Sequence, residues 1–372
     1  MAAGIYVHIP FCLSRCNYCD FYSITADDFI INEFYEALLT QIELVSQRKW
    51  GKRIYNTIYL GGGTPPLIGD EKIGEIIWHL RKCFNFTPNT EITIEANPES
   101  VSPDLLKNLH DFGINRITLG VQSFNDNLLK TLGRPHNSET ADKAIDMIYN
   151  AGFENIGIDL IFGIPGQTIA VWRDTLKKAI NKQPPHISAY ELTIENETPI
   201  ERMINSGELT LLDDDLIAEM YQILHEMLTE SGYKRYEVTN YAKPGFECRH
   251  NLKYWTDRKY LGLGPSAHSY YTKYRTSSYK SVDKYVAALN KGKLPTVFKE
   301  ELSDEQKSQE RLMLGLRLAS GIDIMTVREA IDKEKMAEFI QQGYLKKSIN
   351  TIALTDRGFM IADEIIVKLL KR

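Results

Sequence analysis

Cysteine is scarce in this sequence, with five residues among 372, and this scarcity excludes a small scaffold held together by disulfide bonds. No apolar run approaches the roughly 18–20 residues that a helix needs to cross a bilayer, so no membrane-spanning helix is predicted. The chain also lacks a marked excess of charge, because its net charge is −5 at pH 7. A basic surface for nucleic acid is therefore not expected.

The N-terminus also lacks a targeting pattern. The first ten residues, MAAGIYVHIP, contain no charged segment followed by an apolar one, so we expect no signal peptide. The expected compartment is therefore the reducing cytoplasm. In that compartment clustered cysteines favour metal or redox chemistry over structural disulfides.

The first half of the chain alternates short apolar runs with amphipathic segments. Strands are predicted at 4–9, 56–61, 91–96, 115–121, 155–162 and 186–192. Helices are predicted at 28–48, 70–84, 102–112, 138–151 and 168–181. Six strands joined by helices indicate a parallel sheet, since parallel neighbours need crossover connections. We therefore predict an α/β fold built on a partial (β/α)6 barrel of the TIM type, with its chemistry at the carboxyl ends of the strands.

The pattern changes after about residue 230. Residues 233–275 are rich in tyrosine and irregular, and a charged helical segment begins near residue 301, before a short hairpin and a closing helix. We predict a barrel over 1–230, an extension over 231–300 and a small α+β C-terminal domain of winged-helix type over 301–372. The last of these has no marked basic excess, so we assign it a covering or docking role.

Three of the five cysteines, Cys12, Cys16 and Cys19, lie within eight positions directly after the first predicted strand. A structural zinc site uses four ligands, and either Cys83 or Cys248 would have to complete it. Cys83 falls near the end of a helix predicted on the outside of the barrel. Three thiolates on one short loop suit a 4Fe–4S cluster instead, with one iron left open to chelate a small molecule.

Polar residues follow several predicted strands at the carboxyl end of the barrel. They are Gly63, Thr64, Glu95, Gln122 and Asp159. Arg134, in the segment GRPH, can pair with a carboxylate through its forked guanidinium. Each residue alone is also consistent with a tight turn or a satisfied surface group. Because polar groups at the ends of apolar strands are costly unless paired, their convergence indicates a ligand site.

The C-x3-C-x2-C spacing on the first loop of a barrel resembles the radical S-adenosylmethionine (SAM) superfamily. The resemblance implies a 4Fe–4S cluster held by the three cysteines, with the amino and carboxylate groups of SAM on the open iron. In that superfamily an electron from the cluster cleaves SAM to a 5′-deoxyadenosyl radical. The position without a fourth cysteine is then the place for SAM.

Within that superfamily the blocks HIPFC, GGGTP, GVQSF, GRPH and GIPGQT are similar to the oxygen-independent coproporphyrinogen III oxidase family and its relatives. The resemblance covers essentially the whole chain. Carried over by motif, it implies a SAM site lined by Tyr6, Gly63, Thr64, Glu95, Gln122, Arg134, Asp159 and Ala189.

Two departures from the oxidases bear on function. The oxidases carry a further cysteine two positions after the third ligand, where this chain has Phe21, and a longer segment before the first strand. Residues 249–255, RHNLKYW, resemble the H-N-x-x-Y-W pattern of the haem chaperone branch, where it is associated with haem binding. Both features point away from coproporphyrinogen oxidation.

The resemblance implies a haem site at His250, Asn251, Tyr254 and Trp255. His250 would be an axial ligand oriented by Asn251, and the two aromatic rings would offer flat apolar surface. The alternative interpretation of the motif is a hydrogen-bonded core in a tyrosine-rich loop. His268 is a weaker second candidate.

We therefore predict a haem chaperone that carries a 4Fe–4S cluster and exchangeable SAM and transfers haem to an acceptor protein, with no catalytic residue assigned. The alternative is an oxygen-independent coproporphyrinogen III oxidase, and a radical SAM enzyme with an unrelated substrate is a third. Whether the chain is an enzyme stays open. So do a respiratory haem protein as acceptor, a transient contact with a membrane protein and a homodimer.

Overall fold

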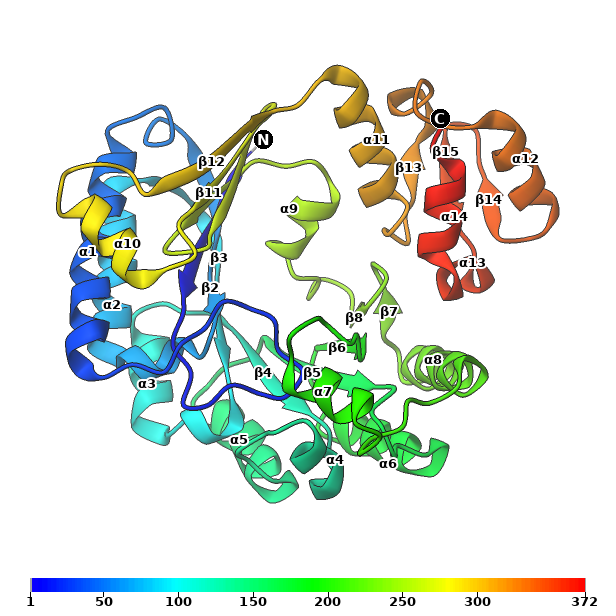
Figure 1. The fold of residues 1–372 in the computed structure, drawn as a ribbon, viewed down its shortest axis with the longest axis horizontal. Helices are drawn as coiled ribbons and strands as arrows, with labels where there is room; N and C mark the ends of the chain where they lie inside the picture. Colours follow the sequence, from blue (N-terminus) through cyan, green and yellow to red (C-terminus); the bar gives the residue numbers. More distant parts are fainter. Residues whose placement is uncertain (1, 372) are drawn as a thin grey trace.

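The computed structural model describes residues 2–371, and a curved sheet forms its centre (Figure 1). Six strands run parallel and follow one another in chain order. They are β1 (Ala3–Ile9), β2 (Ile54–Gly62), β3 (Asn85–Ala96), β4 (Arg116–Gln122), β5 (Ile156–Phe162) and β6 (His186–Glu191). Most of their positions are buried, as expected for strands covered on both faces. The order confirms the predicted partial barrel of six β/α units.

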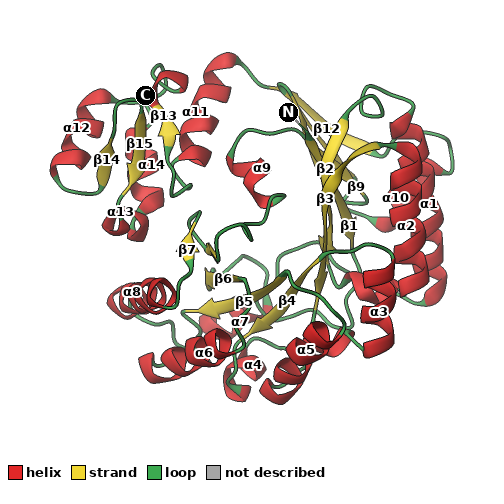
Figure 2. Cartoon of the chain, turned by 180° about the vertical axis from the view of Figure 1, so that it is seen from behind, coloured by secondary structure: helices red, strands yellow, loops and turns green. Residues whose placement is uncertain are grey.

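The predicted helices form and cover the outer face of this sheet (Figure 2). They are α1 (Asp28–Ser46), α2 (Asp70–Cys83), α3 (Pro103–Asp111), α5 (Ser138–Asn150) and α6 (Ile169–Asn181). Local signals fix their starts: the Ser102 hydroxyl, for example, caps α3 by accepting from the Leu105 amide, and Pro103 follows at the first helical position. Helices not predicted from the sequence are α4 (Asp126–Thr131), α7 (Pro199–Asn205) and α8 (Asp214–Glu230).

The segment from residue 231 to residue 301 supplies strands to both edges of the sheet. It contains β7 (Lys234–Arg235), β8 (Asn240–Ala242), α9 (Asn251–Trp255), β9 (Tyr260–Leu263), β10 (His268–Tyr271), β11 (Tyr274–Ser278), α10 (Val282–Leu289) and β12 (Thr296–Glu301). β8 pairs with β6 on one side, and β9 pairs in parallel with β1 on the other. The irregular structure expected over 233–275 is therefore wrong where β7, β8, α9, β9, β10 and the start of β11 fall within that range.

The sheet stays open between its edge strands β7 and β12, and α9 lies on its concave side (Figures 1 and 2). Short 3-10 helices, η1 (Pro65–Ile68) and η2 (Pro98–Ser100), follow β2 and β3. No helix within residues 2–371 has both the length and the apolar character that crossing a bilayer requires.

The C-terminal part of the chain has a small core of its own. It consists of α11 (Asp304–Gly315), β13 (Ile322–Asp323), η3 (Ile324–Thr326), α12 (Lys333–Gln341), β14 (Leu345–Lys347), β15 (Thr351–Leu354), α13 (Asp356–Met360) and α14 (Ala362–Leu369). β15 lies between β13 and β14 in an antiparallel sheet. The predicted hairpin and closing helix are confirmed. An ion pair between Arg235 and Asp356 joins this part to the barrel.

Candidate functional site

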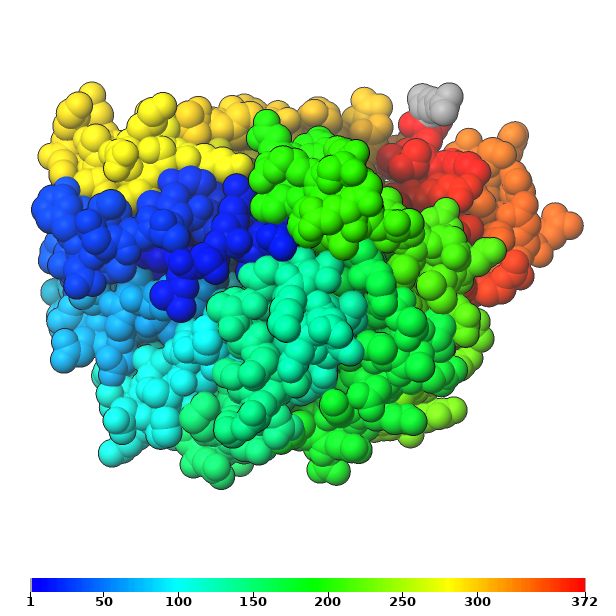
Figure 3. All heavy atoms as spheres, turned by 60° about the horizontal axis from the view of Figure 1, so that its bottom comes forward, coloured from blue at the N-terminus to red at the C-terminus, as the bar shows by residue number. Residues whose placement is uncertain are grey.

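The loop between β1 and α1 carries Cys12, Cys16 and Cys19 across the carboxyl end of the barrel. Backbone hydrogen bonds anchor its middle, because the Asn17 amide donates to the Leu132 carbonyl at 2.9 Å and the Asn17 carbonyl accepts from the Ile200 amide at 2.9 Å. Figure 3 shows this blue N-terminal segment against the green chain around α7. The cysteine loop is therefore held at both α4 and α7, although it has little regular structure of its own.

A cavity of about 410 Å³ opens beneath the cysteine loop. The three cysteines line it, together with seven of the eight residues predicted for the SAM site: Tyr6, Gly63, Thr64, Glu95, Gln122, Arg134 and Asp159. Arg15, Tyr18 and Tyr190 also line the cavity, and the sequence interpretation missed them. Two of these stand within the cysteine loop itself, so the loop sequence was the signal that could have found them.

Ala189 is the predicted SAM residue that the structure places elsewhere. Its side chain is buried in the hydrophobic core of the barrel and does not line the cavity. Successive side chains of a strand point to opposite faces, so on β6 it is Tyr190 that reaches the cavity. This alternation along β6 was the signal that could have identified Tyr190.

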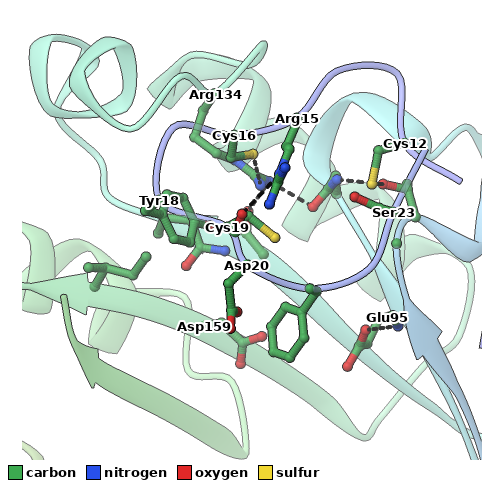
Figure 4. Close-up of a pocket in the computed structure, with 18 of the residues that line it drawn as sticks. Cys12, Arg15, Cys16, Tyr18, Cys19, Asp20, Ser23, Glu95, Arg134 and Asp159 are labelled. Atoms are coloured by element: carbon green, nitrogen blue, oxygen red, sulfur yellow. Dashed lines mark hydrogen bonds between the residues drawn. The ribbon is translucent and has the colours of Figure 1, made fainter. Parts of the chain in front are cut away.

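A chain of polar contacts joins two of the cysteines across the top of the cavity (Figure 4). Arg134 donates to Cys16 Sγ at 3.3 Å and to Asn97 Oδ1 at 2.7 Å. Asn97 Nδ2 donates to Thr64 Oγ1 at 2.9 Å, and Thr64 Oγ1 lies 3.8 Å from Cys12 Sγ. Asn97 thus holds both the guanidinium and the hydroxyl that contact the sulfurs.

Asn97→Ala is expected to loosen this connection without emptying the core, because Asn97 stands at the cavity rather than inside the apolar layer. Loss of two side-chain hydrogen bonds should leave Arg134 less ordered. With the 4Fe–4S cluster expected from the sequence at these cysteines, the yield of iron–sulfur reconstitution should fall about tenfold, the usual effect of removing a group that orients metal ligands. Iron and sulfide analysis measures the yield, and Asn127→Ala, an exposed residue of α4, is the control. An unchanged yield would contradict this role.

The glycines after β2 allow the chain to come close to neighbouring backbone. A Cβ at Gly63 would lie 2.5 Å from the Phe11 carbonyl oxygen, and Gly62 has a φ of +109°. Their amides are already used: Gly62 donates to Glu95 Oε2 at 3.0 Å and Gly63 donates to the Ile9 carbonyl at 2.8 Å. The glycines therefore shape the cavity wall, and their amides are not free for a ligand.

Two carboxyl groups, those of Glu95 and Asp159, lie in the cavity below the cysteine loop (Figure 4). Glu95 accepts from the Tyr59 hydroxyl at 2.7 Å, and burial raises its pKa above the ordinary value. Burial likewise raises the pKa of Asp159 to about 7. Asp159 Oδ1 and Arg134 Nε are both buried without a hydrogen-bond partner. Orphaned polar atoms facing one cavity are costly, and a polar ligand would relieve that cost.

The raised pKa of Asp159 predicts that this carboxyl lowers the stability of the protein without ligand at neutral pH. A carboxyl whose folded pKa exceeds its unfolded pKa weakens the folded state as pH rises through the interval between them, here from 3.8 to about 7. Asp159→Asn removes this loss, so we expect its melting temperature without ligand to exceed that of the unaltered chain by about 2 °C at pH 7.5. The difference should shrink toward pH 4. A difference between the variant and the unaltered chain that is no larger at pH 7.5 than at pH 4 would contradict this account.

The three thiols do not converge on one point. Among the residues that the structure describes, no three His, Cys, Asp or Glu side chains come close enough to hold a single metal ion. Cys83 ends the outer helix α2, far from the loop in the fold, as predicted. Cys248 is fully buried, and burial raises its pKa to about 11, which makes it an inert core thiol.

His250 lies in the interior of the barrel, with only 1% of its surface exposed. Its Nδ1 is hydrogen-bonded to Thr57 Oγ1 at 2.8 Å and its Nε2 to the Tyr254 hydroxyl at 3.0 Å. Burial lowers its pKa to about 3, so the imidazole is neutral at physiological pH. This arrangement matches the alternative interpretation of the motif, in which His250 belongs to a hydrogen-bonded core. In the described hydrogen bonds Thr57 orients the ring, and the Asn251 side chain takes no part.

A row of aromatic rings connects His250 with the cavity. The ring centroids of Tyr6 and Tyr59 lie 6.1 Å apart, those of Tyr59 and His250 5.2 Å, and those of His250 and Tyr254 5.4 Å. Tyr6 lines the cavity, while Tyr254 and Trp255 are half-buried on α9. The segment 250–255 and the cysteine cavity therefore share one barrel interior. His268, the weaker candidate, lies on β10 and is exposed.

In the comparison with known proteins, two family models match parts of this chain. The Radical SAM superfamily matches residues 6–179, and the HemN C-terminal domain matches residues 302–361. Among solved structures, coproporphyrinogen III oxidase (HemN) from Escherichia coli superposes with a TM-score of 0.87 at 23% identity, covering 98% of this chain and 89% of that chain. At this identity the likeness shows the fold alone.

Several curated relatives are similar over nearly the whole length. The protein named Heme chaperone HemW from Lactococcus lactis subsp. lactis (strain IL1403) is 33% identical, with 98% of this chain and 96% of the relative covered. The proteins of the same name from Mycobacterium tuberculosis (strain H37Rv) and Escherichia coli (strain K12) are 34% and 31% identical. Those alignments cover 99% and 98% of this chain, and 94% and 97% of the relatives.

Proposed function

We propose that this chain, which belongs to the HemW family of the radical SAM superfamily, binds haem and transfers it to an acceptor protein. The observation that carries the proposal is its similarity, over nearly the full length, to several proteins named heme chaperone. Fold alone does not decide between a chaperone and an oxidase, because both share this architecture.

We further propose that Cys12, Cys16 and Cys19 hold a 4Fe–4S cluster. In such a cluster each of the three thiolates binds a different iron, so thiols spread around a cavity suit it better than a single ion. When bound, the cluster would supply an electron and one iron without a protein ligand, on which SAM chelates. The tasks of the chain are to hold the sulfurs, through Arg134 and Thr64, and to close the cavity with the anchored loop.

SAM would occupy the cavity below the loop. The unpartnered Arg134 Nε suits its carboxylate, and the unpartnered Asp159 Oδ1 suits a ribose hydroxyl. Glu95 already accepts from Tyr59 and Gly62, so its remaining acceptor capacity is smaller. We propose that Asp159 and Arg134 carry most of the affinity, with Gln122 beside them. Gln122 is held at a positive φ of 64° at the end of β4, a strained conformation typical of ligand sites.

Haem is proposed to bind at residues 250–255. The half-buried rings of Tyr254 and Trp255 offer flat surface, and the neutral His250 imidazole is the form that binds iron. Because the Tyr254 hydroxyl occupies Nε2, iron can bind there only after this hydroxyl leaves. Haem binding would therefore require a movement of α9 that takes the Tyr254 hydroxyl away from His250.

A transfer assay under anaerobic conditions tests the function. The haem-loaded protein is mixed with apomyoglobin, and in parallel the reconstituted protein receives coproporphyrinogen III, SAM and a reductant. We expect haem to appear intact in myoglobin and no protoporphyrinogen to form. Formation of protoporphyrinogen would overturn the proposal in favour of the oxidase.

A further inference from the structure

A cluster of unpaired cations surrounds one tyrosine at the amino ends of the barrel strands. We call it the Tyr271 cluster and define it as Lys49, Arg53, Lys259 and Tyr271. The ammonium of Lys49 lies 4.0 Å from the centre of the Tyr271 ring, the guanidinium of Arg53 lies 4.4 Å from it, and the ammonium of Lys259 lies 5.5 Å from it. Within residues 2–371 none of the three cations forms an ion pair.

The positions of the cluster are fixed by the fold. Lys49 and Arg53 stand in the turn between α1 and β2, and Lys259 immediately precedes β9. Tyr271 ends β10, and the edge of its ring packs against Trp50 with a centroid distance of 4.9 Å. β2 and β9 both begin here, so the cluster lies at the opposite end of the strands from the cysteine cavity.

A hollow adjoins the cations. It measures about 510 Å³ and is lined by Ala2, Lys49, Lys52, Arg53, Ile54 and Tyr271. Arg53 Nε is buried there without a hydrogen-bond partner. Lys52 adds a fourth positive charge at the wall, while no carboxylate lines the hollow.

The charges of the Tyr271 cluster favour an anion as its ligand. Three cations around one ring repel one another, and the face of a single tyrosine offsets only a small part of that repulsion at an exposed site. The whole chain carries a net charge of −5, so a local concentration of unpaired positive charge runs against its average. An anion in the hollow would relieve the repulsion by pairing with the cations that line it.

We propose that the hollow at the Tyr271 cluster binds a phosphate group. A guanidinium with two or three ammonium groups around it suits a compact anion of more than one charge, and phosphate matches both geometry and charge. The phosphate belongs either to a soluble molecule or to a lipid headgroup, and both present the same chemistry to these cations. This site is separate from the cysteine cavity and does not depend on the proposed haem function.

The test compares Lys49→Gln/Arg53→Gln with the control Lys143→Gln/Lys178→Gln. The control removes the same charge from lysines that are ion-paired on the outer helices. Each protein is titrated with inorganic pyrophosphate by calorimetry, and separately with vesicles of phosphatidylglycerol and phosphatidylcholine, using phosphatidylcholine vesicles as the blank. Thermal unfolding of both variants verifies that they are folded.

We expect the cluster variant to bind at least about tenfold more weakly than the control, with affinity falling as salt rises. If the two variants differ in their affinity for pyrophosphate, the ligand of the hollow is a soluble phosphate compound. If they differ only with anionic vesicles, the ligand is a lipid headgroup. Equal affinities of the cluster variant and the control for both probes, or no binding by the unaltered chain, would overturn the proposal.

Discussion

Replacing Cys16 with alanine is expected to abolish iron–sulfur reconstitution, with iron and sulfide per chain falling to background. Cys16 contributes one of only three thiols at the cavity, and Arg134 donates directly to its sulfur. Among the described residues the two other cysteines cannot replace it, since Cys83 stands on the outer helix and Cys248 is buried in the core. With two thiolates left, the cluster would lack a ligand on a second iron.

The matched control is Cys83→Ala, which also removes one half-buried thiol but leaves the cavity unchanged. Its iron and sulfide content and visible absorption should equal those of the unaltered chain. Full reconstitution of the Cys16 variant, or loss in the Cys83 variant, would show that the cysteine loop is not the cluster site. The assay requires no haem and no SAM turnover, so it tests this assignment alone.

Arg116→Leu is expected to lower the free energy of unfolding by about 3–5 kcal/mol, as removal of one member of a buried charged set usually does. Arg116 is 1% exposed at the start of β4, and its guanidinium donates to Thr118 Oγ1 at 2.6 Å. Gly157 on the next strand leaves space for it, because a Cβ there would lie 3.1 Å from Arg116 Nη2. Without the guanidinium, Thr118 Oγ1 loses its donor and the favourable interaction of the Arg116 charge with Cys248 and Glu91 is lost.

Urea unfolding of the protein without ligands measures this loss. Arg173→Leu is the control, because Arg173 is an exposed residue of α6 whose replacement should change stability by less than about 0.5 kcal/mol. A loss for Arg116→Leu no larger than for this control would contradict the role assigned to the buried charge. The nearby Glu95 and Asp159 should also become harder to ionise, since Arg116 opposes the effect of burial on both pKa values.

The barrel could be predicted because its signals are local. The predicted part of each strand from β1 to β6 contains apolar residues that are buried in the sheet. Four of the five predicted helices, α1, α3, α5 and α6, begin behind a capping side chain. By contrast, β9 is only four residues long and forms because it pairs with β1, more than 250 residues earlier in the chain. No local pattern contains that pairing, so the sequence interpretation treated this segment as irregular.

The same distinction applies to the site. The cysteine spacing predicted the loop, and residues at or near the strand ends predicted seven of the thirty residues that line the cavity. Ala189 does not line the cavity, because a motif carried over by resemblance does not say which face of the strand its side chain takes. Of the two partners of His250, Tyr254 stands within the motif, but Thr57 is 193 positions away and no local pattern indicates it.

An anaerobic haem titration followed at the Soret band tests the central claim, haem binding by this chain, most directly. It is made with the reconstituted protein beside His250→Gln and Tyr254→Phe, after thermal unfolding has shown that both variants fold. Removing the Tyr254 hydroxyl frees His250 Nε2 at the cost of one hydrogen bond, worth about 0.5–1.5 kcal/mol. Tyr254→Phe should therefore bind haem as tightly as the unaltered chain or up to about tenfold more tightly.

The account predicts saturation near one haem per chain and at least about tenfold weaker binding by His250→Gln, the loss expected when a metal ligand is removed. Absence of saturable binding by the unaltered, reconstituted protein would contradict the central claim.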